Sequence, residues 1–257
     1  MADLSARFVA SPCCLPQLGL VQLLHLYRDL GFRNIELFTA GGWPSAVDPL
    51  GDADAQAELR TQVEERGMRV TSMHLPPITA EFDVAQAVTA ARFARGVGAD
   101  VVLFKATTRD LYIESAGPYL EATAGVGVTP VLQNHAGAAI STLDDFRAVL
   151  AGIGDPRMRT LLEVGHFARV GVDWRDAYDV LGESIALVHV NDIDGNGRSV
   201  PFGTGTVDFE GLLKHLDDVG YTGNIVVELE LEGHTESIEP TVTGLRDALD
   251  LLGRVAS

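Results

Sequence analysis

Residues 100–106 read DVVLFKA, and residues 224–230 read NIVVELE. Both segments are apolar over consecutive positions and do not alternate strictly between apolar and polar side chains. A strand that faces water on one side alternates, whereas a parallel strand covered on both faces is apolar throughout. The two segments therefore predict buried parallel strands.

Short β-branched runs of this kind alternate with helix-period segments along the whole sequence. We expect eight strands, at Arg7–Ala10, Asn34–Phe38, Arg69–His74, Asp100–Lys105, Thr129–Asn134, Arg159–Glu163, Ile185–Asn191 and Asn224–Glu230. Apolar residues at helical spacing lie between them, with clear stripes at 20–30, 84–91 and 209–219. Eight strand–helix units in 257 residues predict a single (β/α)8 TIM barrel, a fold that typically takes ~250 residues.

The rival fold is an open, doubly wound sheet. That fold needs a glycine-rich phosphate turn after its first strand, and residues 9–19, VASPCCLPQLG, do not form one. The sequence contains no linker and no low-complexity segment. We therefore predict one domain over residues 1–257.

Composition and charge narrow the functional classes. Hydrophobic residues make up 46% of the chain, enough for a large core, and the formal charge is −17 from 36 acidic and 19 basic residues. Such a charge repels phosphate backbones and anionic membranes, so we expect no nucleic-acid and no membrane partner. We identify no signal peptide, and no run reaches the ~20 apolar residues of a membrane span. The only cysteines, Cys13 and Cys14, are adjacent, which fits a reducing compartment and predicts a cytoplasmic protein.

Polar side chains gather where the predicted strands end. Residues 128–137, VTPVLQNHAG, begin as a buried strand and then place Gln133, Asn134 and His135 in a row. Packing alone gives no reason for three hydrogen-bonding side chains at that point. Six of the other predicted strands end in the same way, at Glu36, His74, Lys105, Glu163 with His166, His189 and Glu228. Because the carboxyl ends of parallel barrel strands share one mouth, we expect these residues to converge.

Four of these residues, on the fifth to eighth strands, suit a divalent cation. Two carboxylates, a carboxamide oxygen and an imidazole are ligands that hard or borderline cations take. The carboxylates of Glu163 and Glu228 would balance a 2+ charge. No pair has the tight spacing of a zinc motif, and any one residue taken alone is more easily explained as a hydrogen-bonded structural group. Their recurrence on four consecutive strands favours the metal hypothesis.

Several motifs resemble the xylose isomerase-like barrels grouped as sugar phosphate isomerases/epimerases. That group includes ketose 3-epimerases, inosose isomerases and dehydratases, and endonuclease IV-type enzymes. The matching segments are QNH at 133–135, EVGHFARVGVD at 163–173, HVND at 189–192, VPFGTGTVDF at 200–209 and GYTGNIVVELE at 220–230. The resemblance covers nearly the whole chain and is densest from Val128 to Glu230.

The resemblance implies roles for particular residues. Gln133, Glu163, His189 and Glu228 fall on the four metal-ligand positions of the family, for an ion such as Mn, Mg, Co or Zn. His166 matches the histidine that contacts substrate hydroxyls in the epimerases. Arg198 resembles their substrate-contacting arginine.

The chain departs from the family pattern at two positions. Glu163 stands where the family usually has aspartate, which mostly alters reach. Gln133 stands where the family usually has glutamate, and it can coordinate through its carbonyl oxygen but cannot accept a proton. In the epimerases, the glutamates on the fifth and eighth strands resemble a pair of proton carriers on opposite faces of the substrate. The two-carboxylate cycle is therefore in doubt for this chain, and a metal site with one carboxylate base survives.

We therefore expect a divalent-metal-dependent isomerase or epimerase that acts on a small keto-sugar or keto-polyol through an enediolate. The metal would polarise the carbonyl while Glu228, the first candidate base, removes the α-proton. His166, His135 and Lys105 are candidate partners of that base, with His166 as the second catalytic residue. The missing carboxylate favours a one-base route, either isomerisation or elimination.

Other functions remain as alternatives. β-Elimination on a keto-sugar would make the protein a metal-dependent dehydratase or lyase. A non-catalytic barrel that binds sugar or supports a partner subunit would also tolerate Gln133. Endonuclease IV-type DNA repair fits the fold, but it conflicts with the negative charge and the shortage of basic residues. A homo-oligomer follows the family habit, and nothing in the sequence decides it.

The remaining candidates each have a structural alternative. His74, Lys105, His135 and Arg198 are expected to bind substrate. Lys105 could instead form a buried ion pair with Glu36, Arg198 could be a solvated loop charge, and His74 could be a hydrogen-bonded core histidine. His166 could simply cap its strand. For Asn134 we expect a bracing role at the strand end, and for Trp43 either a shield over the pocket or a plug at the barrel rim.

Overall fold

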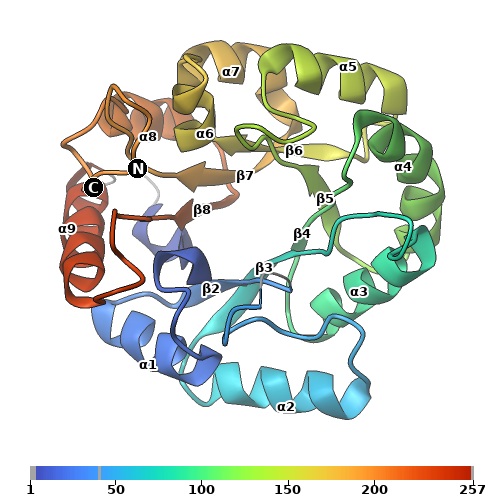
Figure 1. Cartoon of the computed structure of the whole chain (residues 1–257), viewed down its shortest axis with the longest axis horizontal. Helices are drawn as coiled ribbons and strands as arrows, with labels where there is room; N and C mark the ends of the chain where they lie inside the picture. The colour runs from blue at the N-terminus through green and yellow to red at the C-terminus, as the bar shows by residue number, and fades with distance from the viewer. Residues whose placement is uncertain (1–3, 40–41, 256–257) are drawn as a thin grey trace.

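The computed structural model describes residues 4–39 and 42–255, so both ends of the predicted 1–257 domain lie outside the described residues. Eight parallel strands pair in sequence order and close into a barrel (Figure 1). They are β1 (Phe8–Ala10), β2 (Asn34–Leu37), β3 (Arg69–His74), β4 (Val101–Leu103), β5 (Thr129–Leu132), β6 (Arg159–Glu163), β7 (Ile185–Val190) and β8 (Asn224–Val227). The predicted (β/α)8 TIM barrel is confirmed.

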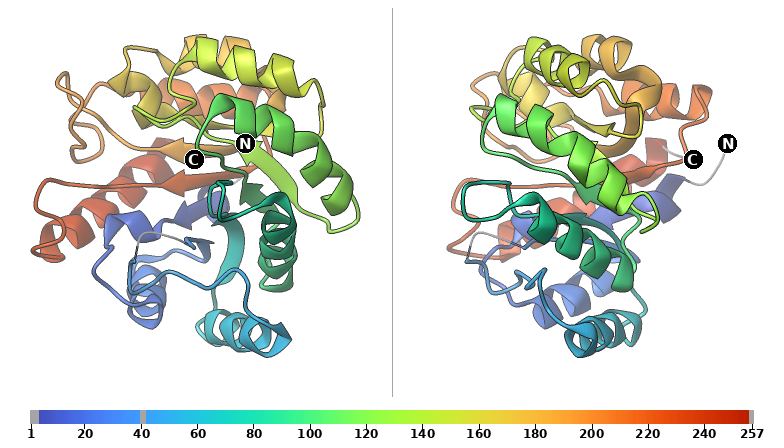
Figure 2. Two further views of the ribbon diagram at one scale, coloured as in Figure 1. Left: turned by 45° about the vertical axis from the view of Figure 1, so that its right-hand side comes forward. Right: turned by 90° about the vertical axis from the view of Figure 1, so that its right-hand side faces the viewer.

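Helices cover the outside of the barrel, as two further views show (Figure 2). The α-helices are α1 (Leu20–Leu30), α2 (Ala53–Glu64), α3 (Val84–Gly96), α4 (Arg109–Thr123), α5 (Leu143–Ile153), α6 (Val164–Arg169), α7 (Trp174–Leu181), α8 (Phe209–Asp218) and α9 (Glu239–Val255). Short 3-10 helices occur at η1 (Leu4–Arg7), η2 (Pro12–Cys14) and η3 (Gly182–Ser184). The three apolar stripes correspond to α1, α3 and α8. In the described ranges, no helix combines the length and apolarity that crossing a membrane requires.

Helix α1 shows how the sequence sets such an element. Its buried stripe contains Leu23, Leu24 and Tyr27, which face the barrel. The helix ends where Gly31 adopts a φ of 110°, in the left-handed region that a residue with a Cβ atom rarely enters. After α8, which ends at Asp218, Gly220 adopts a φ of 70° one residue beyond the C-cap Val219.

Several strands end earlier than predicted. We expected strands over Asp100–Lys105 and Asn224–Glu230, but β4 and β8 stop before the polar residues of those segments. The chain still runs on beside its neighbour, because the N–H of Phe104 donates to the carbonyl of Val131 at 3.0 Å. Strands of a tilted barrel are staggered, so regular pairing stops before the extended chain does. The polar residues therefore lie at the rim.

The barrel interior explains why these polar residues point inward. A compact apolar layer fills the interior, formed by Val9, Val101, Leu103, Val131, Leu161, Leu187 and Val226. Side chains on a strand alternate between its two faces, so a residue two positions further on also faces the interior. Those positions hold Ser11, Lys105, Gln133, Glu163, His189 and Glu228. The apolar layer is thus the floor of a mouth lined by polar side chains.

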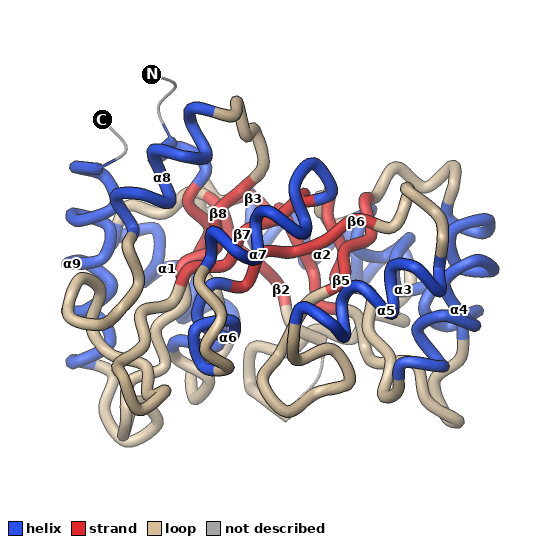
Figure 3. The backbone as a smooth tube through the Cα atoms, turned by 90° about the horizontal axis from the view of Figure 1, so that it is seen from above, coloured by secondary structure: helices blue, strands red, loops and turns tan. Residues whose placement is uncertain are grey.

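Broad loops gather at one end of the barrel, as the side view shows (Figure 3). The loop between β7 and α8 is organised by Asp192, which is fully buried. Its carboxylate accepts hydrogen bonds from the backbone N–H groups of Ile193, Gly203, Gly205 and Val207, at 2.8–3.2 Å. A Cβ atom on Gly205 would lie 2.2 Å from an Asp192 oxygen. The motif from 189 to 209 therefore has a structural role in shaping this loop.

Candidate active site

Three side chains from neighbouring strands meet at the mouth of the barrel. His189 on β7 places its Nδ1 3.0 Å from Glu163 Oε2 and 3.3 Å from Glu228 Oε1. All three residues are buried. Gln133 lies beside them and donates from Nε2 to Glu163 Oε2 at 3.3 Å. We call these four residues the metal half of the mouth.

The metal half fits a divalent cation. Donor atoms of Glu163, His189 and Glu228 lie within 4.8 Å of one another. Glu163 Oε1 is buried and makes no hydrogen bond within the described residues, while the other oxygen of this carboxylate contacts His189 and Gln133. Buried polar atoms normally have a partner, so this oxygen is explained if it is a metal ligand. Rotation of the Gln133 amide would present its carbonyl oxygen in place of the nitrogen, a choice that hydrogen bonding decides.

The charges of the metal half also favour a cation. Burial, and then the facing carboxylate of Glu228, raise the pKa of Glu163 to about 7. Burial alone would lower the pKa of His189, but Glu36, Glu228 and Glu163 together raise it well above its usual value. Glu163 and His189 therefore hold their protons more strongly than usual, because carboxylates lie close together here. A divalent ion would supply the same positive charge.

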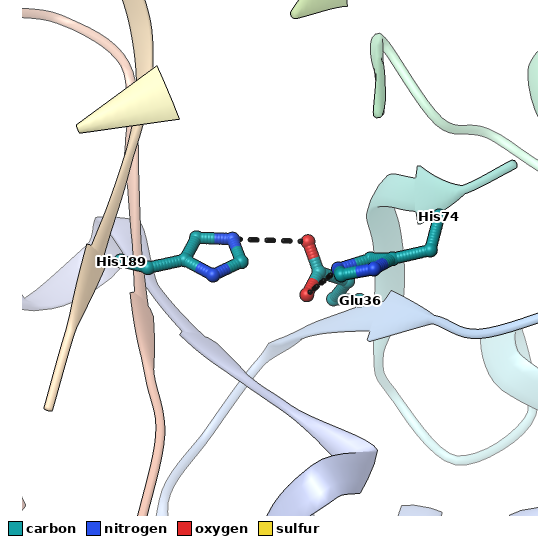
Figure 4. A group of neighbouring side chains, drawn as sticks. All are labelled: Glu36, His74 and His189. Carbon is teal, nitrogen blue, oxygen red and sulfur yellow. Dashed lines mark hydrogen bonds and ion pairs between the residues drawn. The ribbon is translucent and has the colours of Figure 1, made fainter. Parts of the chain in front are cut away.

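A second group of side chains lies across the mouth, on β2 and β3 (Figure 4). Glu36 Oε1 is 2.9 Å from His74 Nε2, and Glu36 Oε2 is 3.3 Å from His189 Nε2. Ser72 Oγ also donates to Glu36 Oε2 at 2.8 Å. The sequence indicated Glu36 as a strand end and a possible partner of Lys105, whereas the structure shows that it also joins the metal half to the opposite side of the mouth. A register shift in the β2–β3 pairing between Ile35 and Glu36 accompanies its position, and such irregularities often lie beside active sites.

Lys105 completes the second group. Its Nζ lies 2.6 Å from His74 Nδ1. The alternative ion pair between Lys105 and Glu36 is wrong as stated, because His74 stands between the two and contacts both. We call Glu36, His74 and Lys105 the lysine half of the mouth.

His135 and His166 pack against each other at the edge of the mouth, with their ring planes tilted by 42°. Their ring centroids are 3.9 Å apart, and the N–H of Ala136 donates to His166 Nδ1 at 3.4 Å. His166 lies within α6, so it does not cap β6. Burial is the main reason that the pKa of His166 falls to about 3, and it also lowers the pKa of His135. Both rings are therefore neutral near pH 7, and they offer hydrogen-bonding nitrogens to a ligand.

Arg198 lies away from this cluster, in the loop that Asp192 shapes. Its guanidinium pairs with Asp194 at 2.7 Å, and its side chain is 64% exposed. It lines a surface cavity with Ser199 and Glu230. Arg198 could contact a substrate, as predicted, only if its guanidinium left Asp194 or if the substrate extended to this cavity.

Two further expectations concern Asn134 and Trp43. The bracing role of Asn134 is wrong, because neither side-chain polar atom has a hydrogen-bond partner within the described residues, although the residue is fully buried. The ring of Trp43 lies 5.1 Å from Phe38, and Phe38 stacks on His74 at 3.8 Å. Trp43 therefore packs at the rim behind the lysine half.

Comparison with known proteins places the chain in a family. The profile of the xylose isomerase-like TIM barrel family matches residues 24–255. The chain belongs to this family, as the motifs at the strand ends indicated. No curated protein sequence matches the chain.

Solved structures give the same fold. A D-psicose 3-epimerase with D-tagatose, from Clostridium cellulolyticum H10, has 15% identity and a TM-score of 0.77, and the match covers 98% of this chain and 99% of that one. The probable 3-DHS dehydratase AsbF from Bacillus anthracis has 14% identity and a TM-score of 0.75, with 96% and 98% covered. The IolI protein with a binding zinc atom gives the same four values. At these identities the likeness shows the fold alone.

Proposed function

We propose that this protein is a divalent-metal-dependent isomerase or epimerase that acts on a small keto-sugar or keto-polyol. The observation that carries the proposal is the placement of His189 Nδ1 at 3.0–3.3 Å from two buried carboxylates at the mouth. Gln133, Glu163, His189 and Glu228 would hold the ion. A bound Mn, Mg, Co or Zn ion would polarise the carbonyl of the substrate. The zinc atom in the IolI structure supports metal binding by this fold.

Glu228 is the base in this proposal. Burial opposes its ionisation, but His189 outweighs burial and lowers the pKa of Glu228 to about 2. The carboxylate is therefore ionised and can accept the α-proton that the polarised carbonyl makes acidic. Ser11 Oγ lies 3.3 Å from Glu228 Oε1 and donates to it, which fixes the orientation of the carboxylate.

The other polar residues of the mouth would hold the substrate. Lys105, His135 and His166 would offer nitrogen atoms to the substrate, and Arg198 lies at the outer edge of the mouth. Both ring nitrogens of His74 are engaged by Glu36 and Lys105, so His74 would act on the substrate through Lys105 and its ring surface. The apolar layer below them excludes water from the base of the mouth. Cytoplasmic location and homo-oligomer formation stay predictions from the sequence.

Elimination of water from a keto-sugar is the second candidate. It is favoured by Gln133, which cannot return a proton, and it fits the dehydratase named among the structural neighbours. The two reactions share proton removal by Glu228. They differ in product, since elimination gives an unsaturated compound that absorbs in the ultraviolet.

The test is proton exchange in D2O. The protein, loaded with metal, is incubated with D-fructose, D-tagatose and 2-keto-myo-inositol, and deuterium at the α-carbon is followed by NMR. We expect exchange with a member of this panel, its loss with a chelator, and its return when metal is added back. Turnover that continues unchanged after complete metal removal would contradict the proposal.

A further inference from the structure

The sequence uses lysine very sparingly. Among its 19 basic residues, only Lys105 and Lys214 are lysines, and all others are arginines. Lys214 lies on the surface of α8, where it pairs with Asp218 at 2.6 Å and its side chain is 71% exposed. Lys105 is instead at the mouth, two residues beyond the apolar interior residue Leu103.

The difference between the two basic residue types is chemical. An arginine keeps its proton under all ordinary conditions, whereas a buried lysine can lose and regain one near neutral pH. A cation needed only for binding could have been an arginine, as it is almost everywhere else in this chain. The choice of lysine at position 105 therefore points to proton transfer.

The surroundings of Lys105 hold its amine in a defined direction. His74 Nε2 lies 2.9 Å from the Glu36 carboxylate, and a carboxylate can only accept. The ring therefore carries its proton on Nε2 and leaves Nδ1 as the acceptor for a Lys105 N–H at 2.6 Å. Burial, and then the charge of Lys105, lower the pKa of His74 to about 4, which keeps that ring neutral. One N–H of Lys105 is thus anchored, and the others are available to a ligand.

The electrostatics of Lys105 suit a proton carrier. Burial lowers the pKa of Lys105 to about 8, against the opposing attraction of Glu36, Glu228 and Glu163. A catalytic acid works best when its pKa lies near the working pH. The titratable groups that act on it from the surrounding elements are Glu36, His74, His135, Glu163 and Glu228.

The topology places Lys105 opposite the proposed base. The strands follow one another around the closed barrel in sequence order, so β4 and β8 lie on opposite sides of it (Figure 1). Lys105 follows β4, and Glu228 follows β8. A substrate in the mouth would therefore have Glu228 on one side and Lys105 on the other. Gln133, which follows the neighbouring strand β5, cannot carry a proton.

We propose that Lys105 is the second proton carrier of this site and that the reaction is epimerisation of the carbon next to the keto group. This inference rests on the proposed function. Glu228 takes the α-proton, the C–H electron pair becomes the C=C bond of the enediol form, and the carbonyl pair moves to oxygen. A Lys105 N–H bond then breaks, and its proton forms the new C–H bond on the opposite face while the carbonyl re-forms. Glu228 then releases its proton to solvent and Lys105 takes one from solvent, so the net change is inversion at one carbon.

The experiment separates proton removal from proton delivery. Lys105→Met, Lys105→Arg and the surface control Lys214→Met are compared with the wild type, using the same three sugars in D2O. For Lys105→Met we expect epimer formation to fall by ~10²–10⁴-fold more than α-proton exchange falls. Lys105→Arg keeps the charge but should not restore epimer formation. Lys214→Met should behave as wild type.

Other outcomes overturn the inference and can be told apart from failure of the proposed function. Epimer formation at wild-type rate in Lys105→Met, its recovery in Lys105→Arg, or an equal fall of exchange and epimer formation would each contradict a proton-delivering role. Absence of metal-dependent exchange in the wild type would instead count against the proposed function.

A second measurement needs no substrate. Lysine labelled with ¹³C at Cε gives two NMR signals, which Lys214→Met assigns. We expect the Lys105 signal to titrate near pH 8. Titration in the range of an ordinary lysine, about 10.4, would overturn the inference.

Discussion

The two halves of the mouth differ in what they can bind. The metal half, Gln133, Glu163, His189 and Glu228, brings two carboxylates around one ring nitrogen and needs positive charge. The lysine half, Glu36, His74 and Lys105, already contains its cation, with a neutral histidine between the charges. One half is thus built for an ion and the other for a movable proton. Glu36 touches both halves, because its two oxygens contact His74 and His189.

The largest effect is expected from removing the centre of the metal half. His189→Gln takes away the ring nitrogen that faces Glu163 and Glu228. We expect metal affinity to fall by more than the roughly 100-fold that loss of a supporting group costs, and turnover to fall with it. Titration calorimetry measures the affinity, and a circular dichroism spectrum checks the fold. Unchanged stoichiometric binding would show that the ion lies elsewhere.

Removal of the proposed base Glu228 should affect proton exchange and product formation equally, unlike removal of Lys105. Glu228→Gln keeps an oxygen for the ion but cannot take a proton, so we expect α-proton exchange and product formation to fall together by ~10²–10⁴-fold. The Lys105→Met variant should instead lose far more product formation than exchange. NMR in D2O records both rates in one experiment. Retained exchange in Glu228→Gln would assign proton removal to another residue.

Substitution of Glu36, which contacts both halves, should have an intermediate effect on metal affinity. Glu36→Gln removes the charge beside His189 Nε2, and we expect metal affinity to fall by roughly 10–100-fold, as for other partners of metal-bound histidines. Ser72→Ala is the matched control, because Ser72 contacts Glu36 but not His189, and its effect should be smaller. Equal metal affinities in the wild type, Glu36→Gln and Ser72→Ala would mean that Glu36 acts only within the lysine half.

The smallest effect is expected at the outer edge. Arg198 is exposed and paired with Asp194, and exposed ion pairs contribute little. We expect Arg198→Ala to change KM by no more than a few-fold and to leave kcat unaltered. Steady-state kinetics with the best sugar of the panel measures both. A large fall in kcat would place Arg198 at the reacting atoms and contradict its position in the loop.

The metal half could be predicted from sequence, and the lysine half only in part. Glu163, His189 and Glu228 end apolar strands, and motifs around them are distinctive, so their convergence follows from the barrel. The contacts between side chains across the mouth depend on the stagger of the strands and on their local register. The hydrophobic periodicity of the sequence does not give either of these. The register shift beside Glu36 is such a case.

Two other outcomes of the sequence analysis have physical reasons. The strand ends were placed too late because extended, apolar chain continues past regular pairing at the rim. The motif after β7 was correctly recognised, but its main visible role is structural, since Asp192 accepts four backbone N–H groups there. A sequence motif indicates that a residue is important. It does not show whether that residue binds a ligand or stabilises the chain.

The central claim is that side chains at the carboxyl ends of β5, β6, β7 and β8 surround one divalent ion. A crystal of the metal-replete protein, measured at the absorption edge of the added metal, tests it most directly. For an ion such as zinc, we expect one anomalous peak about 2.0–2.2 Å from His189 Nδ1 and from oxygens of Glu163 and Glu228. A mouth without such a peak, with these side chains turned away from one another, would contradict it.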